Sequence, residues 1–152
     1  MPELHVVLYQ PEIPYNTGSV GRTCVALGAK LWLVRPLGFQ LDDRQLKRAG
    51  LDYWAHLDWQ VVDDWADLRR RLPTDRLWLL TKRADRSYLE ADYQPGDALV
   101  FGAESSGLPD SLHSEFPNRR LRIPTRPEVR SLNLSVAVAV TAYEAARQTQ
   151  LA

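Results

Sequence analysis

Residues 121–147 read LRIPTRPEVRSLNLSVAVAVTAYEAAR, and this stretch decides how the C-terminal part of the chain folds. It begins as a short apolar strand that Pro124 ends, and Ser131 stands where it could cap a helix by accepting a hydrogen bond from a free amide. Residues 134–143 are almost wholly apolar and small, with no polar stripe at helical spacing. This pattern predicts a C-terminal helix that is covered on most sides.

The loop within this stretch is rich in positive charge. Five arginines lie from Arg119 to Arg130, and Glu128 is the single acidic residue among them. This excess favours an anionic partner, with Arg126 and Arg130 as candidate phosphate contacts. By spacing alone, an edge strand, a proline turn and a plain core helix explain the stretch equally well.

Three segments together carry a family resemblance. They are NTGSVGRT at residues 16–23, LVFGAESSGLP at 99–109 and IPTRPEVRSLNLSVAVAV at 123–140. In order and spacing they resemble the three motifs of the SPOUT methyltransferases. LYQPEIPYNTG at residues 8–18 also resembles the opening of the minimal subfamily, which methylates the ribose 2'-hydroxyl of the tRNA wobble nucleotide. The resemblance covers nearly the whole chain, so it is more specific than a single loop signature.

The composition indicates one globular domain over residues 1–152. The chain is 45% hydrophobic and 25% charged, and its formal net charge is zero. No apolar run reaches the roughly 20 residues that a membrane helix needs, and no secretory signal is visible, so we expect no membrane partner and a cytoplasmic location. Zero net charge argues weakly against non-specific nucleic-acid binding but allows a local basic face.

The cysteine and the histidines predict neither a disulfide nor a metal site. Cys24 is the single cysteine and falls in an apolar helical pattern, which favours a packing thiol over a reactive one. The three histidines are scattered, without the cysteine or carboxylate spacing of metal ligands. The chain also lacks the glycine-rich fingerprints of dinucleotide and nucleoside triphosphate sites.

Strands and helices alternate along the chain. The strands are expected at residues 4–9, 31–34, 59–62, 76–81, 98–101 and 119–123, and the helices at 16–27, 42–50, 63–72, 110–116 and from 133 onward. This alternation predicts an α/β domain with a mainly parallel sheet flanked by helices. The SPOUT resemblance implies in addition a deep C-terminal trefoil knot and a homodimer, in which a second copy would cover the apolar helix.

The resemblance implies S-adenosyl-L-methionine as the cofactor. A site for this molecule needs apolar walls, backbone donors and acceptors for adenine, and polar groups for the ribose and the amino-acid end. In the family the cofactor is held at positions that match Leu80, Gly102, Ile123 and Ser131. Glu104 is a further candidate, which could accept hydrogen bonds from ribose or from loop amides. Core packing, a tight turn or helix capping would explain these residues without a cofactor.

Arg22 is the candidate catalytic residue, because the matching arginine of the family lies beside the reacting ribose. Free guanidinium is a poor base, with a pKa above about 12. Arg22 could therefore act as a perturbed base, or it could hold the neighbouring phosphate and polarise the 2'-hydroxyl. A solvated helix arginine is the alternative interpretation.

Asn16, Arg130 and Tyr143 are the candidate RNA-binding residues. Asn16 could orient the catalytic residue or the RNA, or could cap a helix. Tyr143 matches a family tyrosine that helps to bind tRNA, where its ring could stack on a base, and a core tyrosine is the alternative. Two positions depart from the family, since Ser106 replaces a common arginine and Val136 a common asparagine. These departures concern one RNA or interface contact and one helix hydrogen bond at the knot.

The function that the resemblance implies is methyl transfer from S-adenosyl-L-methionine to the ribose 2'-oxygen of the wobble nucleotide. That nucleotide is cytidine or uridine 34, in the anticodon loop of leucine tRNAs. Within the same class, the alternative is a 2'-O-methyltransferase of another tRNA or rRNA site. From another class, the alternative is a non-catalytic RNA-binding α/β module, which the zero net charge and the two departures support.

Overall fold

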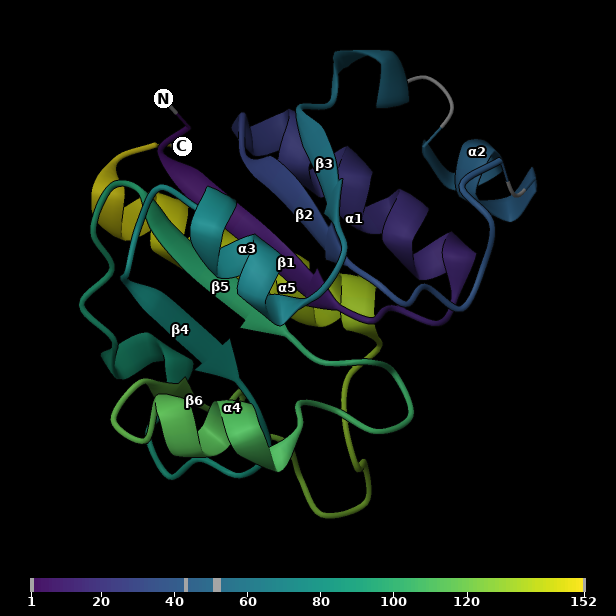
Figure 1. Cartoon of the computed structure of the whole chain (residues 1–152). Coiled ribbons are helices and arrows are strands. Elements are labelled where there is room, and N and C mark those ends of the chain that lie inside the picture. The colour runs from purple at the N-terminus through teal and green to yellow at the C-terminus, as the bar shows by residue number, and fades with distance from the viewer. Residues whose placement is uncertain (1, 43, 51–52, 152) are drawn as a thin grey trace.

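Six parallel strands form one sheet in the computed structural model, which describes residues 2–42, 44–50 and 53–151 (Figure 1). The order across the sheet is β3-β2-β1-β5-β4-β6, and each neighbouring pair runs parallel. The strands are β1 (Leu4–Tyr9), β2 (Lys30–Val34), β3 (Trp59–Val62), β4 (Leu77–Leu80), β5 (Asp97–Phe101) and β6 (Arg120–Leu121). The prediction of a six-stranded parallel α/β sheet is confirmed.

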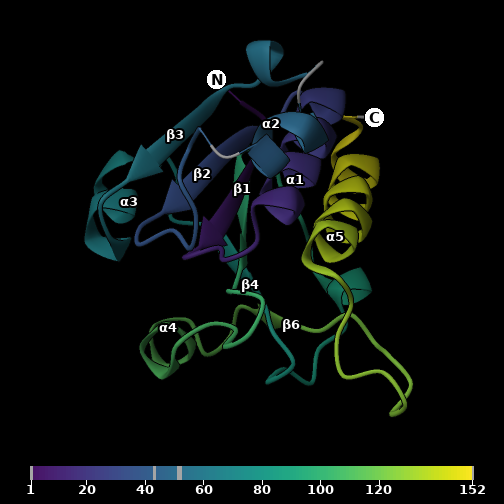
Figure 2. The same ribbon diagram turned by 90° about the vertical axis from the view of Figure 1, so that its right-hand side faces the viewer.

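Helices cover both faces of this sheet. α1 (Pro14–Leu27) and α5 (Leu134–Thr149) lie side by side on one face, and α3 (Trp65–Arg71) and α4 (Asp110–Glu115) pack on the other (Figure 2). α2 (Arg44–Gly50) packs on the outer side of α1. The short 3-10 helices η1 (Trp54–His56) and η2 (Tyr88–Glu90) lie in the connections before β3 and β5.

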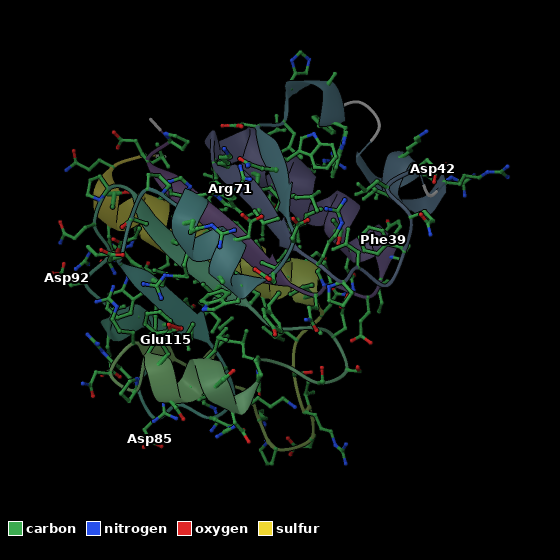
Figure 3. All side chains as sticks on the ribbon, viewed as in Figure 1. Phe39, Asp42, Arg71, Asp85, Asp92 and Glu115 are labelled. Carbon is green, nitrogen blue, oxygen red and sulfur yellow. The ribbon has the colours of Figure 1, made fainter. Side chains whose placement is uncertain are left out.

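The two covered faces explain why the strands read as apolar runs. In β1, Leu4, Val6 and Leu8 pack in the core that α1 and α5 complete, while Val7 packs in the core that α3 and α4 complete. Parallel strands that are buried on both faces lack the alternation of half-buried strands. On the α3 side, Glu115 of α4 accepts hydrogen bonds from Arg69 and from the indole of Trp65, which joins the two short helices (Figure 3).

α1 begins earlier than the sequence predicts. Ile13 is its N-cap residue and Pro14 lies in its first turn, while Asn16 and Thr17 are buried inside the helix. The prediction that Asn16 or Thr17 caps this helix is therefore wrong. The predicted end is correct, because Gly28 follows the last turn in the left-handed region with a φ of 68°. For the second helix, the predicted start includes Asp43, which lies outside the described residues.

α5 is capped by Asn133, not by Ser131 as predicted. The Asn133 side-chain oxygen accepts a hydrogen bond from the amide of Ser135 over 2.9 Å. Asparagine is among the best N-cap residues and stands directly before the first helical position, so local geometry favours it over a serine two residues upstream.

The outer face of α5 is exposed within one chain. Leu134, Val138 and Ala142 are buried, but Val136 is 46% exposed and Tyr143 is 48% exposed. Apart from Val136, Tyr143 and Arg147, every residue of α5 is buried or half-buried, so the prediction that this helix is covered on most sides is confirmed. The knot that the resemblance implies stays a prediction.

Cys24 behaves as the sequence predicts. Its side chain is buried between α1 and the sheet, and burial raises the pKa of the thiol to about 12, so the prediction of a packing thiol is confirmed. Within the described ranges, no helix combines the length and apolar character needed to cross a membrane.

Candidate active site

A cavity of about 560 Å³ opens at the carboxyl ends of β4 and β5. Its walls come from the loops that follow β4, β5 and β6 and from the first turns of α1 and α5. Ligands of open parallel sheets bind in the crevice outside the carboxyl ends of the strands. The volume lies within the range of about 300–1,000 Å³ that is typical of small-molecule sites.

Seven of the nine candidate site residues line this cavity, namely Asn16, Leu80, Gly102, Glu104, Ile123, Arg130 and Ser131. The five cofactor candidates are all among them. Arg22 and Tyr143 are not among the lining residues. Leu80 is also a core residue at 9% exposure, so it packs and lines the cavity at once.

The loop after β5 folds back over Gly102. The Ala103 carbonyl accepts a hydrogen bond from the Gly107 amide over 2.9 Å, and Gly107 has a φ of 66°. A Cβ on Gly102 would lie 2.3 Å from the Gly107 carbonyl carbon and 2.5 Å from the Leu108 nitrogen. Only glycine fits here, so the same residue makes the tight turn and lines the cavity.

The Glu104 carboxylate holds the N-terminus of α1. Its Oε1 accepts a hydrogen bond from the Glu12 amide over 2.8 Å, and its Oε2 accepts one from the Ile13 amide over 2.9 Å. In return, the Glu12 carboxylate accepts hydrogen bonds from the hydroxyl and the amide of Ser105, which hold the pKa of Glu12 below its usual value. Both Glu104 oxygens are thus engaged by amides, as an acid at a helix N-terminus should be.

Asn16 joins the three motif segments. Its Nδ2 donates to Glu104 Oε2 over 3.2 Å, and its Oδ1 accepts from Asn133 Nδ2 over 3.0 Å. Asn16 is 5% exposed, so Glu104 and Asn133 fix the orientation of its amide. The network links the loop after β1, the loop after β5 and the start of α5 into one frame around the cavity.

Thr81 and His113 also line the cavity, and sequence reasoning missed both. His113 Nδ1 lies 2.9 Å from the Pro109 carbonyl, and its Nε2 lies 2.8 Å from the Thr81 hydroxyl. Because a carbonyl can only accept, Nδ1 donates, and in the neutral ring Nε2 accepts from the Thr81 hydroxyl. The two residues are distant in sequence, so no local signal could have paired them.

The model of the SpoU rRNA Methylase family matches residues 3–143. The chain belongs to the SpoU rRNA methylase family. The SPOUT resemblance of the sequence is thereby confirmed.

Two relatives of this SpoU family protein match it along almost their full length. The tRNA (cytidine(34)-2'-O)-methyltransferase of Methylovorus glucosotrophus (strain SIP3-4) is 47% identical over 148 residues, which cover 97% of this chain and 96% of the relative. The protein of the same name from Acidovorax sp. (strain JS42) is 48% identical over 147 residues, which cover 95% of this chain and 91% of the relative.

Solved structures show the same fold. One structure, which concerns the 2-OH methylation of C/U34 on tRNA, matches with a TM-score of 0.91 at 52% identity and covers 95% of both chains. An AdoMet-bound rRNA methyltransferase from Sinorhizobium meliloti matches with a TM-score of 0.86 at 26% identity, over 95% of this chain and 56% of that one. The predicted SPOUT fold is therefore confirmed.

The cavity of this SpoU rRNA methylase family member has apolar walls and a basic rim. Leu80, Phe101 and Ile123 supply apolar surface, and Lys82, Arg83, Arg122 and Arg130 contribute cationic side chains at its edge. Arg83 is paired with Asp110 of α4. Apolar walls with loop amides and hydroxyls fit an adenosyl group, and the rim fits phosphate or carboxylate.

In this SpoU family protein, Arg22 and Tyr143 lie on the exposed sides of α1 and α5. Arg22 is exposed on α1, and its guanidinium lies over the Tyr53 ring at 4.8 Å from the centroid. Tyr143 is exposed on α5, which packs beside α1. Within one chain the two residues are therefore not brought into the cavity. In the part of the chain that the structure describes, no group of histidines, cysteines and carboxylates could hold a metal ion.

Proposed function

We propose that the protein methylates the ribose 2'-oxygen of cytidine 34 in tRNA, with S-adenosyl-L-methionine as the methyl donor. One observation carries the proposal. The four family cofactor positions and the further candidate Glu104 all line one cavity, in a chain that is 47% identical to a tRNA (cytidine(34)-2'-O)-methyltransferase. We extend the proposal to uridine 34, because both nucleotides carry the same ribose hydroxyl and the related solved structure concerns C/U34.

The residues that would hold the cofactor are Leu80, Gly102, Ile123 and Ser131. Leu80 and Ile123 offer apolar surface at strand ends, and Gly102 lets the 103–108 loop close over the cavity. Glu104 acts indirectly in this proposal, since its carboxylate fixes the loop by holding the α1 amides. S-adenosyl-L-methionine, when bound, supplies an electrophilic methyl group on a sulfonium. An AdoMet-bound relative at 26% identity supports this assignment.

The reaction is an in-line displacement at the methyl carbon. The ribose 2'-oxygen forms the new bond to carbon, the carbon–sulfur bond breaks with its electrons going to sulfur, and the hydroxyl proton leaves to a base or to water. Such a step needs above all a positioned nucleophile. Arg22 is the proposed catalytic residue. It either accepts that proton or holds the adjacent phosphate and polarises the hydroxyl, and both roles require contact with the ribose.

A homodimer would bring Arg22 to the ribose. Ile13 and Tyr15 at the start of α1 and Val136 near the start of α5 form an exposed apolar face on two adjacent helices, with exposures of 44%, 55% and 46%. Arg22 follows Tyr15 by seven positions, about two helical turns, and so shares its side of α1. We propose that a second copy covers this face and that Arg22 of one copy serves the cavity of the other, which Ile13 borders.

RNA recognition in this proposal uses the cationic rim and the exposed tyrosine. Arg130 contacts a phosphate, Tyr143 stacks on a base of the unpaired anticodon loop, and Asn16 acts by orienting the frame around the cavity. We propose leucine tRNAs as the substrates, residues 1–152 as one catalytic domain, and the cytoplasm as the location. The leucine assignment rests on the family resemblance alone.

The test is to incubate purified protein with total tRNA and labelled S-adenosyl-L-methionine, and then to map the methyl group by nuclease digestion and mass spectrometry. We expect label on the 2'-oxygen of nucleotide 34 of leucine tRNAs. Label on a base, on a ribose outside the anticodon loop, or only on rRNA would overturn the wobble assignment. No labelling of any RNA, together with no heat of S-adenosyl-L-methionine binding in calorimetry, would favour the RNA-binding module.

A further inference from the structure

We propose that Tyr53 is a positioning residue that holds the Arg22 guanidinium in the orientation needed for methyl transfer. The inference rests on the proposed catalytic role of Arg22. The Arg22 guanidinium carbon lies over the Tyr53 ring, 4.8 Å from the ring centroid. A guanidinium within about 6 Å of an aromatic centroid is attracted to the ring face. The contact is made to the ring face and uses no hydrogen-bond acceptor, so it leaves the guanidinium N–H donors for the RNA.

The chain builds this contact by packing η1 directly on α1. Tyr53 is the N-cap residue of η1, and its carbonyl accepts a hydrogen bond from the His56 amide over 2.9 Å. The next residue, Trp54, lies against Gly21 of α1, where a Cβ would come within 2.6 Å of the Trp54 ring. Trp54 is in turn held by Trp59 of β3, with ring centroids 5.1 Å apart. Because Trp54 lies over Gly21, its neighbour Tyr53 lies over Arg22.

A second glycine of α1, Gly18, allows α2 to pack closely on α1. A Cβ on Gly18 would lie 2.5 Å from the Ala49 Cβ and 2.7 Å from the Leu46 carbonyl oxygen, so α2 packs on α1 at backbone distance. Gly18 and Gly21 thus let residues 44–50 and 53–57 lie close along α1. This close packing gives an otherwise exposed arginine a fixed neighbour on a well-anchored segment. Placement of that kind matters, because an error of about 1 Å in a reacting group can cost about a hundredfold in rate.

The test compares Tyr53→Leu with Tyr53→Phe. We expect Tyr53→Leu to lower kcat for tRNA methylation about tenfold or more, because the ring face is lost. The S-adenosyl-L-methionine affinity, measured by calorimetry, should stay unchanged, since Tyr53 does not line the cavity. Tyr53→Phe keeps the ring face and should restore kcat. Tyr9→Leu is the matched control, because half-buried Tyr9 also packs by its ring, against Trp65 in the core on the other face of the sheet.

A double-mutant cycle separates positioning from general stability. If Tyr53 acts through Arg22, then Tyr53→Leu should change the residual rate of Arg22→Ala by less than about twofold. An equal loss of kcat from Tyr53→Leu in the wild-type and Arg22→Ala backgrounds would overturn the inference, and so would full turnover by Tyr53→Leu. NMR of the Arg22 side chain adds a readout without catalysis. Its ring-current shift should vanish in Tyr53→Leu and persist in Tyr53→Phe.

Failure of the proposed function gives a different result. Wild-type protein that methylates no tRNA would overturn that function whatever the Tyr53 variants do. Wild-type protein that methylates nucleotide 34, with Tyr53→Leu equally active, would overturn only the role of Tyr53.

Discussion

Asn133 donates a hydrogen bond from Nδ2 to the Oδ1 of Asn16 over 3.0 Å, across 117 positions of sequence. The same Asn133 side chain caps α5 through its oxygen, which accepts from the Ser135 amide. Asn16 meanwhile donates to Glu104, whose carboxylate holds the start of α1. The Asn133 amide therefore caps α5 and joins it, through Asn16, to the carboxylate that holds the start of α1, and both helices border the cavity.

Asn133→Ala should remove the cap and the bridge together, at a cost of about 1–2 kcal/mol in the free energy of unfolding. Asn133→Ser should keep the cap but lose the bridge, because serine is too short to reach Asn16. We expect Asn133→Ser to be more stable than Asn133→Ala, but to bind S-adenosyl-L-methionine more weakly than the wild-type protein. Chemical denaturation and calorimetry measure the two effects, and equal stability of the two variants would argue against the cap.

Gly102→Ala should destabilise the protein by about 1–3 kcal/mol and weaken cofactor binding. The added Cβ would lie 2.3 Å from the backbone of Gly107, which cannot move without opening the loop. Thermal unfolding and calorimetry check the prediction. Ser111→Ala, on the exposed part of α4, is the control and should leave both quantities unchanged. Normal cofactor affinity in Gly102→Ala would show that the cavity is not the binding site.

Arg22→Ala should lower kcat by about a hundredfold or more, if Arg22 contacts the reacting ribose. The affinity for S-adenosyl-L-methionine should not change, since Arg22 lies outside the cavity lining. Arg22→Lys tests the geometry, because lysine keeps the charge but not the planar fork. We expect lysine to restore little turnover. Wild-type kcat in Arg22→Ala would remove the residue from the mechanism.

Val136→Glu should convert a dimer to a monomer, because it puts a charge in the exposed apolar face of α5. Val129→Glu is a matched control, since Val129 is similarly exposed at 49% but lies in the loop before α5. Light scattering at micromolar concentration measures the mass of each variant. Wild-type protein that is monomeric in this measurement would contradict the proposed homodimer.

Stability should fall as the pH drops from 6.5 to about 4, because burial lowers the pKa of His5 over that interval. Folded His5 stays neutral and accepts a hydrogen bond from the Trp32 indole over 3.0 Å, whereas the unfolded chain takes up a proton. Acid therefore favours the unfolded state in this window, and the loss from this group ends once both states are protonated. His5→Asn should flatten the dependence of the melting temperature on pH. An unchanged slope in that variant would exclude His5 as the cause.

Much of the fold could be predicted because its signals are local. The apolar runs of β1 and β2 and the left-handed Gly28 each express a preference that neighbouring residues set. The predicted caps of α1 and α5 were wrong because several polar residues stand near each of these helix starts, whereas the predicted cap Asp64 of α3 is confirmed. α5 is capped by Asn133 and not by Ser131. The N-cap residue of α1 is Ile13, and Glu104, from a distant loop, accepts the hydrogen bond of its amide.

The sequence by itself determined the parallel α/β sheet, since that depends on hydrophobic pattern, and the resemblance of its motifs to a known family implied the set of cofactor candidates. Only the tertiary structure decided what the polar residues do. It turned Glu104 and Asn16 toward helix amides and Asn133, paired Thr81 with His113, and laid Arg22 over Tyr53 outside the cavity. The physical reason is that hydrogen bonds and ring contacts act over a few ångströms in space, and the chain brings together groups that are far apart in sequence only when its core packs.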